Sequence, residues 1–184
     1  MTEPTPGTIL ISAGQIQQRV REIARQIARD HPEPADLHFV CVLKGAFMFL
    51  GDLIRAMDRT VSIDFMALSS YAKGATSSGE VRLVKDLDTG LEGRNVVIVE
   101  DIVDTGLTLS YLQEILRARS PSSLRTACLL SKPSRRLVEV QVDYIGFTIE
   151  DRFVAGYGLD YAEKYRNLPH ISVVEGDLEP ANLS

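Results

Sequence analysis

The most informative segment of this sequence is Val96-Val97-Ile98-Val99-Glu100-Asp101-Ile102-Val103-Asp104-Thr105-Gly106-Leu107-Thr108-Leu109. Four apolar residues run into two adjacent carboxylates, a third carboxylate follows three residues later, and a Thr-Gly-Leu-Thr turn leads into a helical pattern. Continuous apolar runs are typical of strands that are buried on both faces. The segment therefore predicts a buried strand whose carboxyl end meets the N-terminus of a helix.

The Thr-Gly-Leu-Thr turn predicts an anion site, because backbone N–H groups and two hydroxyls converge at a helix N-terminus. Gly106 lets the backbone come close to a phosphate. Carboxylates would repel that phosphate, so they make sense if they face a different group, such as sugar hydroxyls or a bridging Mg²⁺. A ribose 5-phosphate unit meets this description. The plainer interpretation is that Glu100 and Asp101 are solvated loop acids and that Asp104 is a helix N-cap.

The composition is that of a globular protein and excludes several other classes. Of the 184 residues, 45% are hydrophobic and 24% are charged, which excludes disorder of the whole chain. No apolar run approaches the ~20 residues of a membrane helix, and a net charge of −5 disfavours nucleic acid as a partner. The first residues lack the segments of a secretory signal. With Cys41 and Cys128 interpreted as reduced thiols in apolar runs, we expect a cytoplasmic protein.

Hydrophobic periodicity predicts strands and helices in alternation along a single domain. Residues 1–8 are expected to be a mobile tail, and Ser12 and Gln15 match a capping box at the start of the first helix. The polar, glycine-containing stretch Ser69–Gly79 predicts a flexible loop. The expected helices are Ser12 to Pro32, Gly45–Met57 and about Leu109–Arg119. The expected strands are Leu37–Leu43, Val61–Leu68, Val81–Lys85, Asn95–Val99, Leu124–Leu130, Tyr144–Ile149 and Ile171–Val174.

This order of elements predicts an α/β fold. Alternating strands and helices, with strands that are continuous apolar runs, favour a mostly parallel central sheet flanked by helices. Ligands of such sheets bind outside the carboxyl ends of the strands. We therefore expect the functional residues directly after the strands.

Several motifs resemble those of a known family. Val97–Thr108 is similar to the phosphoribosyl-pyrophosphate signature of the type I phosphoribosyltransferases, in the variant of the hypoxanthine (hypoxanthine–guanine) branch. Further similar segments follow in the family's order, so that the resemblance covers roughly residues 10–176. These segments are Val42-Leu43-Lys44-Gly45-Ala46, Ser69-Ser70-Tyr71, Leu130-Ser131-Lys132 and Asp151-Arg152-Phe153-Val154-Ala155-Gly156-Tyr157-Gly158-Leu159-Asp160-Tyr161.

The resemblance implies a fold and a reaction. The fold is that of the type I phosphoribosyltransferases, one domain over residues 1–184 with a small hood over the carboxyl ends of the strands. Parts of the N- and C-terminal segments, about 150–184, would form the hood. The reaction joins a 6-oxopurine base, hypoxanthine or guanine, to phosphoribosyl pyrophosphate with Mg²⁺ and releases pyrophosphate. The family also implies a homodimer or homotetramer.

The resemblance assigns the central motif to the sugar phosphate and to catalysis. Asp104 would be the general base that faces the purine. Glu100 and Asp101 would hold the ribose hydroxyls and Mg²⁺, directly or through water. The 5′-phosphate would lie on Thr105, Gly106, Leu107 and Thr108. At Leu107 some relatives place a lysine, so here backbone and hydroxyl donors would carry the binding.

Four other residues are implied at the pyrophosphate and metal end. Lys44 and Gly45 follow a strand, at the step where relatives bind pyrophosphate and often have a non-proline cis peptide bond. Arg166 would also contact pyrophosphate, and Asp160 would contact a second Mg²⁺ or the 2-position of the base. The alternative interpretation is that Lys44 and Arg166 are surface cations.

The purine site is implied by residues after the later strands. Lys132 would donate to the purine 6-oxygen, and because an ammonium group has no acceptor it would leave a 6-amino group unpaired. Adenine should therefore be a poor substrate. The base would also contact Phe153 by stacking, the backbone of Val154, the apolar walls Ile102 and Leu159, and a closing loop with Ser70 and Tyr71 at its inner edge. The alternatives are a solvated lysine, core positions for the apolar residues, and a loop that is only mobile.

Two rival functions stay open. The first is a transferase that prefers xanthine or guanine. The second is a regulator that kept the fold and binds a nucleotide or nucleic acid without catalysis. The retained Asp104, Lys132 and loop together favour an enzyme.

Overall fold

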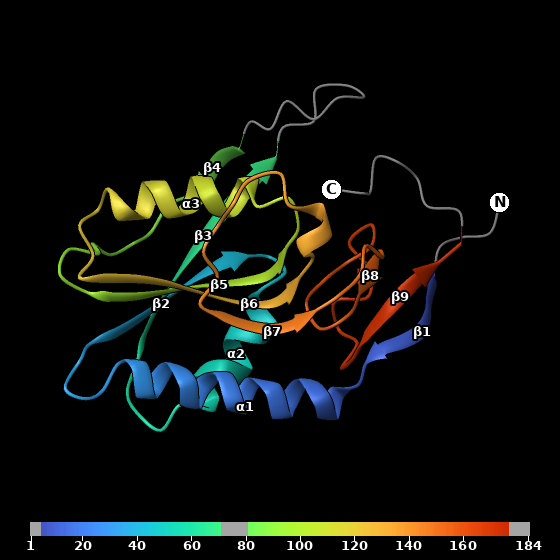
Figure 1. The fold of residues 1–184 in the computed structure, drawn as a ribbon, viewed down its shortest axis with the longest axis horizontal. Helices are drawn as coiled ribbons and strands as arrows, with labels where there is room; N and C mark the ends of the chain where they lie inside the picture. Colours follow the sequence, from blue (N-terminus) through green and yellow to red (C-terminus); the bar gives the residue numbers. More distant parts are fainter. Residues whose placement is uncertain (1–4, 71–80, 177–184) are drawn as a thin grey trace.

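The computed structural model describes residues 5–70 and 81–176 and is built around a six-stranded sheet (Figure 1). The strand order is β4-β3-β2-β5-β6-β7, parallel except for β4, which pairs antiparallel with β3 at one edge. The strands are β2 (Leu37–Leu43), β3 (Ser62–Ser70), β4 (Val81–Lys85), β5 (Asn95–Val103), β6 (Ser123–Ser131) and β7 (Tyr144–Thr148). The predicted α/β class with a mostly parallel sheet is confirmed.

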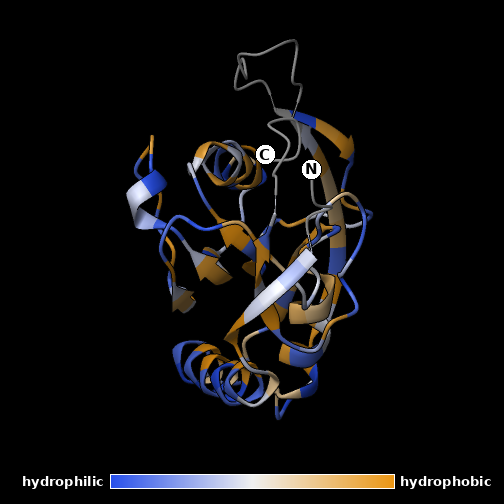
Figure 2. Cartoon of the chain, turned by 90° about the vertical axis from the view of Figure 1, so that its right-hand side faces the viewer, coloured by the Kyte–Doolittle hydropathy of each residue, from blue (hydrophilic) through white to orange (hydrophobic). Residues whose placement is uncertain are grey.

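Helices cover both faces of this sheet, with α1 (Ala13–Asp30) and α2 (Phe47–Arg55) on one face and α3 (Leu107–Arg117) on the other. The predicted capping box begins α1, since Ser12 N donates to Gln15 Oε1 at 2.9 Å and Ser12 Oγ accepts from Gln15 N. Each helix turns its apolar side inward, and Figure 2 shows this for α1. The central strands are buried from both sides, which explains their continuous apolar runs.

A small second sheet lies at the carboxyl ends of the strands, on the side to which the arrows of β5, β6 and β7 point (Figure 1). Its order is β1 (Thr5–Ile11), β9 (Ile171–Glu175), β8 (Val154–Ala155), with antiparallel pairing throughout. We call this sheet, with the turn between β8 and β9, the hood. It joins the two ends of the chain, as the family fold implies.

Several element boundaries differ from the predictions, four of them near the site or the hood. Residues 5–8 are not a tail but part of β1, because they pair with β9, a partner distant in sequence; residues 1–4 lie outside the described residues. The strand β5 continues through its acids to Val103. The helix α3 begins at Leu107, since Gly106 adopts a left-handed φ of 87° that turns the chain directly into the helix. The helix α2 begins at Phe47, two residues later than expected.

The loop predicted at Ser69–Gly79 is described only at its start. Ser69 and Ser70 are the last residues of β3, and Tyr71 with the rest of the loop lies outside the described residues.

A non-proline cis peptide bond lies between Leu43 and Lys44, one bond before Lys44–Gly45. Among the described residues, no helix is long and apolar enough to span a membrane.

The two cysteines should be chemically inert in the folded protein. Cys41 and Cys128 are fully buried on opposite faces of the sheet, and burial raises the pKa of each thiol to about 12. Since only the thiolate is nucleophilic, a disulfide reagent at mildly alkaline pH should leave both thiols of the native protein unmodified. Both should react in denaturant. Rapid modification of either thiol in the native protein would contradict the described core.

Candidate active site

The acids at the end of β5 are not freely solvated, since Glu100 is buried and Asp101 is partly buried. Glu100 is only 6% exposed. Burial raises the pKa of its carboxyl well above the usual range, and the charge of the adjacent Asp101 raises it further. Burial likewise raises the pKa of Asp101 to about 6, against hydrogen bonds from the backbone that favour its ionised form. Two adjacent acids with raised pKa values at a strand end indicate a functional site. The interpretation of these residues as solvated loop acids is therefore wrong.

The turn at Gly45 lies directly against one of these acids. A Cβ atom at Gly45 would fall 1.5 Å from Asp101 Oδ2, so no side chain fits there unless the carboxylate moves. On its other side the turn meets the hood, where a Cβ at Gly158 would fall 2.0 Å from Gly45 O. The Lys44–Gly45 turn is thus enclosed between the acid of β5 and the hood.

The turn from Asp104 to Gly106 opens α3 without a side-chain cap. Gly106, which has no side chain, is the N-cap residue, so Asp104 is not the helix cap. Thr105 Oγ1 accepts from Leu107 N at 3.4 Å, and the first amides of a helix have no partner within it. Amides and hydroxyls at Thr105–Thr108 can therefore bind an anion, as the sequence predicts.

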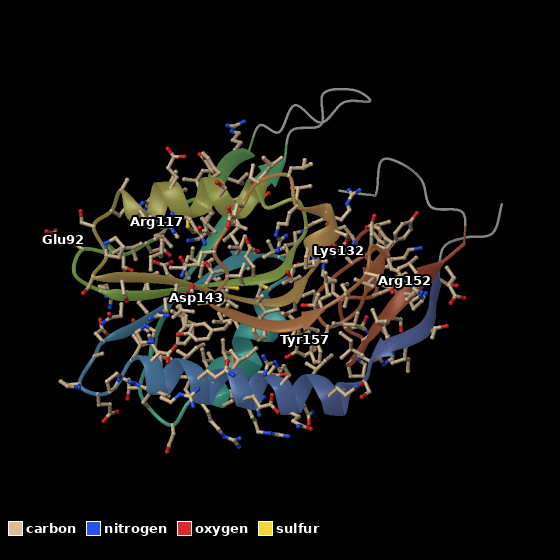
Figure 3. All side chains as sticks on the ribbon, viewed as in Figure 1. Glu92, Arg117, Lys132, Asp143, Arg152 and Tyr157 are labelled. Carbon is tan, nitrogen blue, oxygen red and sulfur yellow. The ribbon has the colours of Figure 1, made fainter. Side chains whose placement is uncertain are left out.

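A chain of alternating charges connects Asp104 to Lys132. Arg135 Nε donates to Asp104 Oδ1 at 3.2 Å, Arg135 Nη1 lies 3.7 Å from Asp151 Oδ2, and Lys132 Nζ lies 3.6 Å from Asp151 Oδ1. The Lys132 side chain is only 8% exposed, so it is not a solvated lysine. Figure 3 shows Lys132 at the hood end of the sheet, with Glu92 at the opposite end. The structure thus brings together the two residues predicted to face the purine.

The cations of the pyrophosphate end form ion pairs within the turn of the hood. Lys44 Nζ lies 3.0 Å from Glu163 Oε2, and both side chains are largely exposed. Arg166 pairs with Asp160 at 2.7 Å and with Glu163 at 3.4 Å, and it donates to Gly158 O at 2.9 Å. Arg166 is therefore more enclosed than a surface cation, whereas Lys44 keeps the exposure that the alternative interpretation expects.

The apolar residues predicted at the purine lie in the hood and its base. Phe153 contacts the Tyr161 ring edge to face, with ring centroids 5.5 Å apart. Val154 and Leu159 are buried in the main core, and Ile102 packs partly buried against it. Their contact with a base remains a prediction.

Glu100 and Asp101 are suitable for binding Mg²⁺ only when a bound ligand supplies further oxygen atoms. Among the described residues, no three acidic, histidine or cysteine side chains converge on one point, and Asp160 is paired with Arg166. Mg²⁺ is commonly held by one or two carboxylates with water and phosphate oxygens. The Asp101 carboxylate, which faces the Lys44–Gly45 turn, fits that pattern, with Glu100 beside it.

A family comparison agrees with this geometry. The model of the phosphoribosyl transferase domain matches residues 11–162. The chain belongs to this family. Phosphoribosyltransferases that are similar to it include the hypoxanthine-guanine phosphoribosyltransferase of Bacillus subtilis (strain 168), which is 48% identical over 91% of this chain and 92% of its own. The enzyme of the same name from Streptococcus thermophilus is 43% identical over 97% of this chain and 98% of its own.

Solved phosphoribosyltransferases have the same fold. A crystal structure of a hypoxanthine-guanine phosphoribosyltransferase from Bacillus anthracis matches with a TM-score of 0.88 and 44% identity, covering 95% of this chain and all of its own. A hypoxanthine phosphoribosyltransferase from Staphylococcus aureus matches with a TM-score of 0.88 and 43% identity over 92% of each chain. The fold resemblance stated from the sequence is therefore confirmed.

Sequence reasoning did not single out the residues that support the predicted site. Arg135 and Asp151 connect Asp104 to Lys132. Tyr157 Oη donates to Asp52 Oδ2 at 2.7 Å, which ties the hood to helix α2. Asp151 and Tyr157 lie within a quoted motif and Arg135 follows another, but the sequence pattern assigns none of them a role. Their partners are far away along the chain.

Removal of the Tyr157 hydroxyl should loosen the hood. Burial, with the Asp52 carboxylate beside it, raises the pKa of Tyr157, so the phenol is a donor to a charged acceptor. We expect Tyr157→Phe to lower the free energy of unfolding by about 1 kcal/mol, because Asp52 is partly exposed and keeps some hydration. Urea unfolding measures this change. Tyr111→Phe on α3, where no hydrogen bond of the described structure involves the hydroxyl, is the matched control and should change nothing.

Proposed function

We propose that this protein transfers the 5-phosphoribosyl group from phosphoribosyl pyrophosphate to hypoxanthine and guanine, which gives IMP and GMP in purine salvage. The observation that carries the proposal is the placement of Asp104 and Lys132 at the ends of neighbouring strands, joined through Arg135 and Asp151. The names of its relatives support the same substrates.

In this proposal the chain's own residues hold the two ends of the sugar and accept one proton. Thr105, Gly106, Leu107 and Thr108 bind the 5′-phosphate through amides and hydroxyls. Asp104 accepts the proton of the purine imidazole ring as N9 bonds to C1′. The bond from C1′ to the pyrophosphate oxygen breaks, and its electron pair leaves with pyrophosphate. Lys44, Gly45 and Arg166 receive that leaving group, and their positive charges offset its negative charge.

The acids bind the ribose and a cation. Glu100 and Asp101 accept hydrogen bonds from the ribose hydroxyls and hold Mg²⁺ directly or through water, and Asp160 contacts a second Mg²⁺ or the 2-position of the base. When bound, Mg²⁺ neutralises charge on the pyrophosphate group. Because burial raises the pKa of Asp101, a cation also favours the ionised form of that carboxyl.

In this proposal, the choice of base follows from the hydrogen-bond donors and the apolar side chains of the purine site. Lys132 donates to a 6-oxo group and leaves a 6-amino group unpaired. Phe153 stacks on the base, the backbone of Val154 pairs with its edge, and Ile102 and Leu159 close the apolar wall.

The wider setting is part of the proposal. We expect a homodimer or homotetramer in the cytoplasm, with phosphoribosyl pyrophosphate and a 6-oxopurine as its partners and neither nucleic acid nor membrane. A transferase that prefers xanthine or guanine is the alternative, because an ammonium group at Lys132 suits every 6-oxopurine. A regulator without catalysis is the less favoured one.

The proposal is tested by a panel of bases. The protein is incubated with phosphoribosyl pyrophosphate, Mg²⁺ and each of hypoxanthine, guanine, xanthine, adenine and orotate, and nucleotide formation is followed by absorbance. We expect turnover with hypoxanthine and guanine and little with adenine. A preference for adenine or orotate would contradict the role of Lys132, and no turnover with any base would favour the regulator.

The role of Asp104 gives a sharper prediction. Asp104→Asn keeps the size of the side chain but removes its ability to take a proton, so we expect turnover to fall by about 10²–10⁴-fold. Affinity for phosphoribosyl pyrophosphate, measured by calorimetry, should persist. Asp58→Asn, the same change at an exposed aspartate, is the control. Unchanged turnover in Asp104→Asn would remove this residue from the mechanism.

A further inference from the structure

The segment that carries Lys132 is tied to each carbonyl of the turn that carries Asp104. Lys132 N donates to Val103 O at 3.0 Å, and Leu137 N donates to Thr105 O at 2.9 Å. The carbonyl between them, Asp104 O, accepts from the Arg136 side chain. Three successive carbonyls are thus fixed by one short stretch that follows β6.

The guanidinium group of Arg136 bridges the two strand ends. Its Nη1 donates to Val103 O at 2.6 Å and to Asp104 O, and its Nη2 donates to Ser131 Oγ at 2.9 Å. Ser131 is the last residue of β6, is buried, and directly precedes Lys132. One planar, permanently charged group therefore holds the backbone of Asp104 and the residue next to Lys132 in a fixed relation.

We propose that Arg136 is a positioning residue that sets the gap between Asp104 and Lys132, and hence both the rate of transfer and the choice of purine. The inference rests on the proposed function, in which the base lies between these two side chains. Arg136 itself contacts backbone and Ser131, so it acts through its neighbours. The hydrogen bonds of Thr105 O, by contrast, come from Leu137 and Val138 and do not depend on Arg136.

An arginine is required for this task because of its shape. A guanidinium group offers several donors in a rigid plane and can reach three acceptors at once, whereas a lysine presents a compact charge on a flexible stem. Arg136→Lys therefore keeps the charge and loses the bridge. The base and the proton acceptor must meet within a fraction of an ångström, and a misplacement of about 1 Å can cost ~10²-fold in rate.

Arg59 provides a matched control for a purely structural role. It also ties two backbone carbonyls, those of His31 and Ala35, through its two terminal nitrogens. Those carbonyls precede β2, so Arg59 lies at the amino ends of the strands, away from the proposed site. Arg59→Lys and Arg136→Lys should both lower the melting temperature, and only the second should alter purine use.

The experiment compares the two variants with the wild-type protein. For Arg136→Lys we expect kcat/KM for hypoxanthine to fall about 100-fold and the preference for hypoxanthine over adenine to shrink. The dissociation constant for phosphoribosyl pyrophosphate, measured by calorimetry, should stay unchanged, because the Thr105–Thr108 turn keeps its own hydrogen bonds. Arg59→Lys should leave all three quantities at their wild-type values.

Several outcomes would overturn the positioning role of Arg136. An Arg136→Lys protein that matches Arg59→Lys in rate and preference overturns the inference, and so does a loss confined to phosphoribosyl pyrophosphate binding. If Arg136→Lys does not fold, Ser131→Ala removes one arm of the bridge and should give a smaller change of the same kind; no change there overturns the inference. If the wild-type protein forms no nucleotide, the proposed function itself fails.

Discussion

Two successive residues at the end of β5 carry carboxylates, one buried and one partly buried, and the rest of the site is arranged around this unfavourable placement. A buried charge without a partner is unfavourable, and here burial raises the pKa values of both Glu100 and Asp101. The strand could end in apolar residues at less cost. The acids are compatible with a ligand that brings hydroxyls and a cation to them, and the neighbouring helix N-terminus accepts the anionic end of the same ligand. In the proposed function, these two ends fix the direction of the sugar phosphate, with its hydroxyls toward the acids and its phosphate toward the helix.

The hood lies against the Lys44–Gly45 turn, which in turn contacts Asp101 at the end of β5. Gly158 packs on the carbonyl of Gly45, Tyr157 donates to Asp52, and Arg166 is held by acids within the hood turn. These contacts place residues that are far apart in the sequence around the Lys44–Gly45 turn. The ion pair between Lys44 and Glu163 is exposed, so it is screened by water and can be exchanged for an anionic ligand at little cost. The hood is therefore anchored by buried contacts, while the Lys44 ammonium group beside it remains open to exchange.

The parts of the molecule that were predictable from sequence are those with a local pattern. The strand and turn around Glu100–Thr108, the capping box at Ser12 and the limits of β2 follow from periodicity and from short motifs. Of the hood strands, β9 was predicted, whereas β1 and β8 were missed. The strand β1 is paired with β9 across the whole chain, and nothing in residues 5–8 reports a partner 167 positions away. Arg136 was unpredictable for the same reason, since two of its three acceptors, the carbonyls of Val103 and Asp104, lie more than 30 residues away in the sequence. The placement of Asp101 against Gly45 likewise depends on the alignment of neighbouring strands.

The central claim is that a sugar phosphate lies across the end of β5, with its phosphate on the turn before α3 and its hydroxyls toward Glu100 and Asp101. A crystal structure of the protein soaked with IMP tests it most directly. We predict density for the phosphate at the amides of Thr105–Thr108, the ribose beside the two acids and the purine between Asp104 and Lys132. Density for the nucleotide at any other place on the molecule would contradict the account.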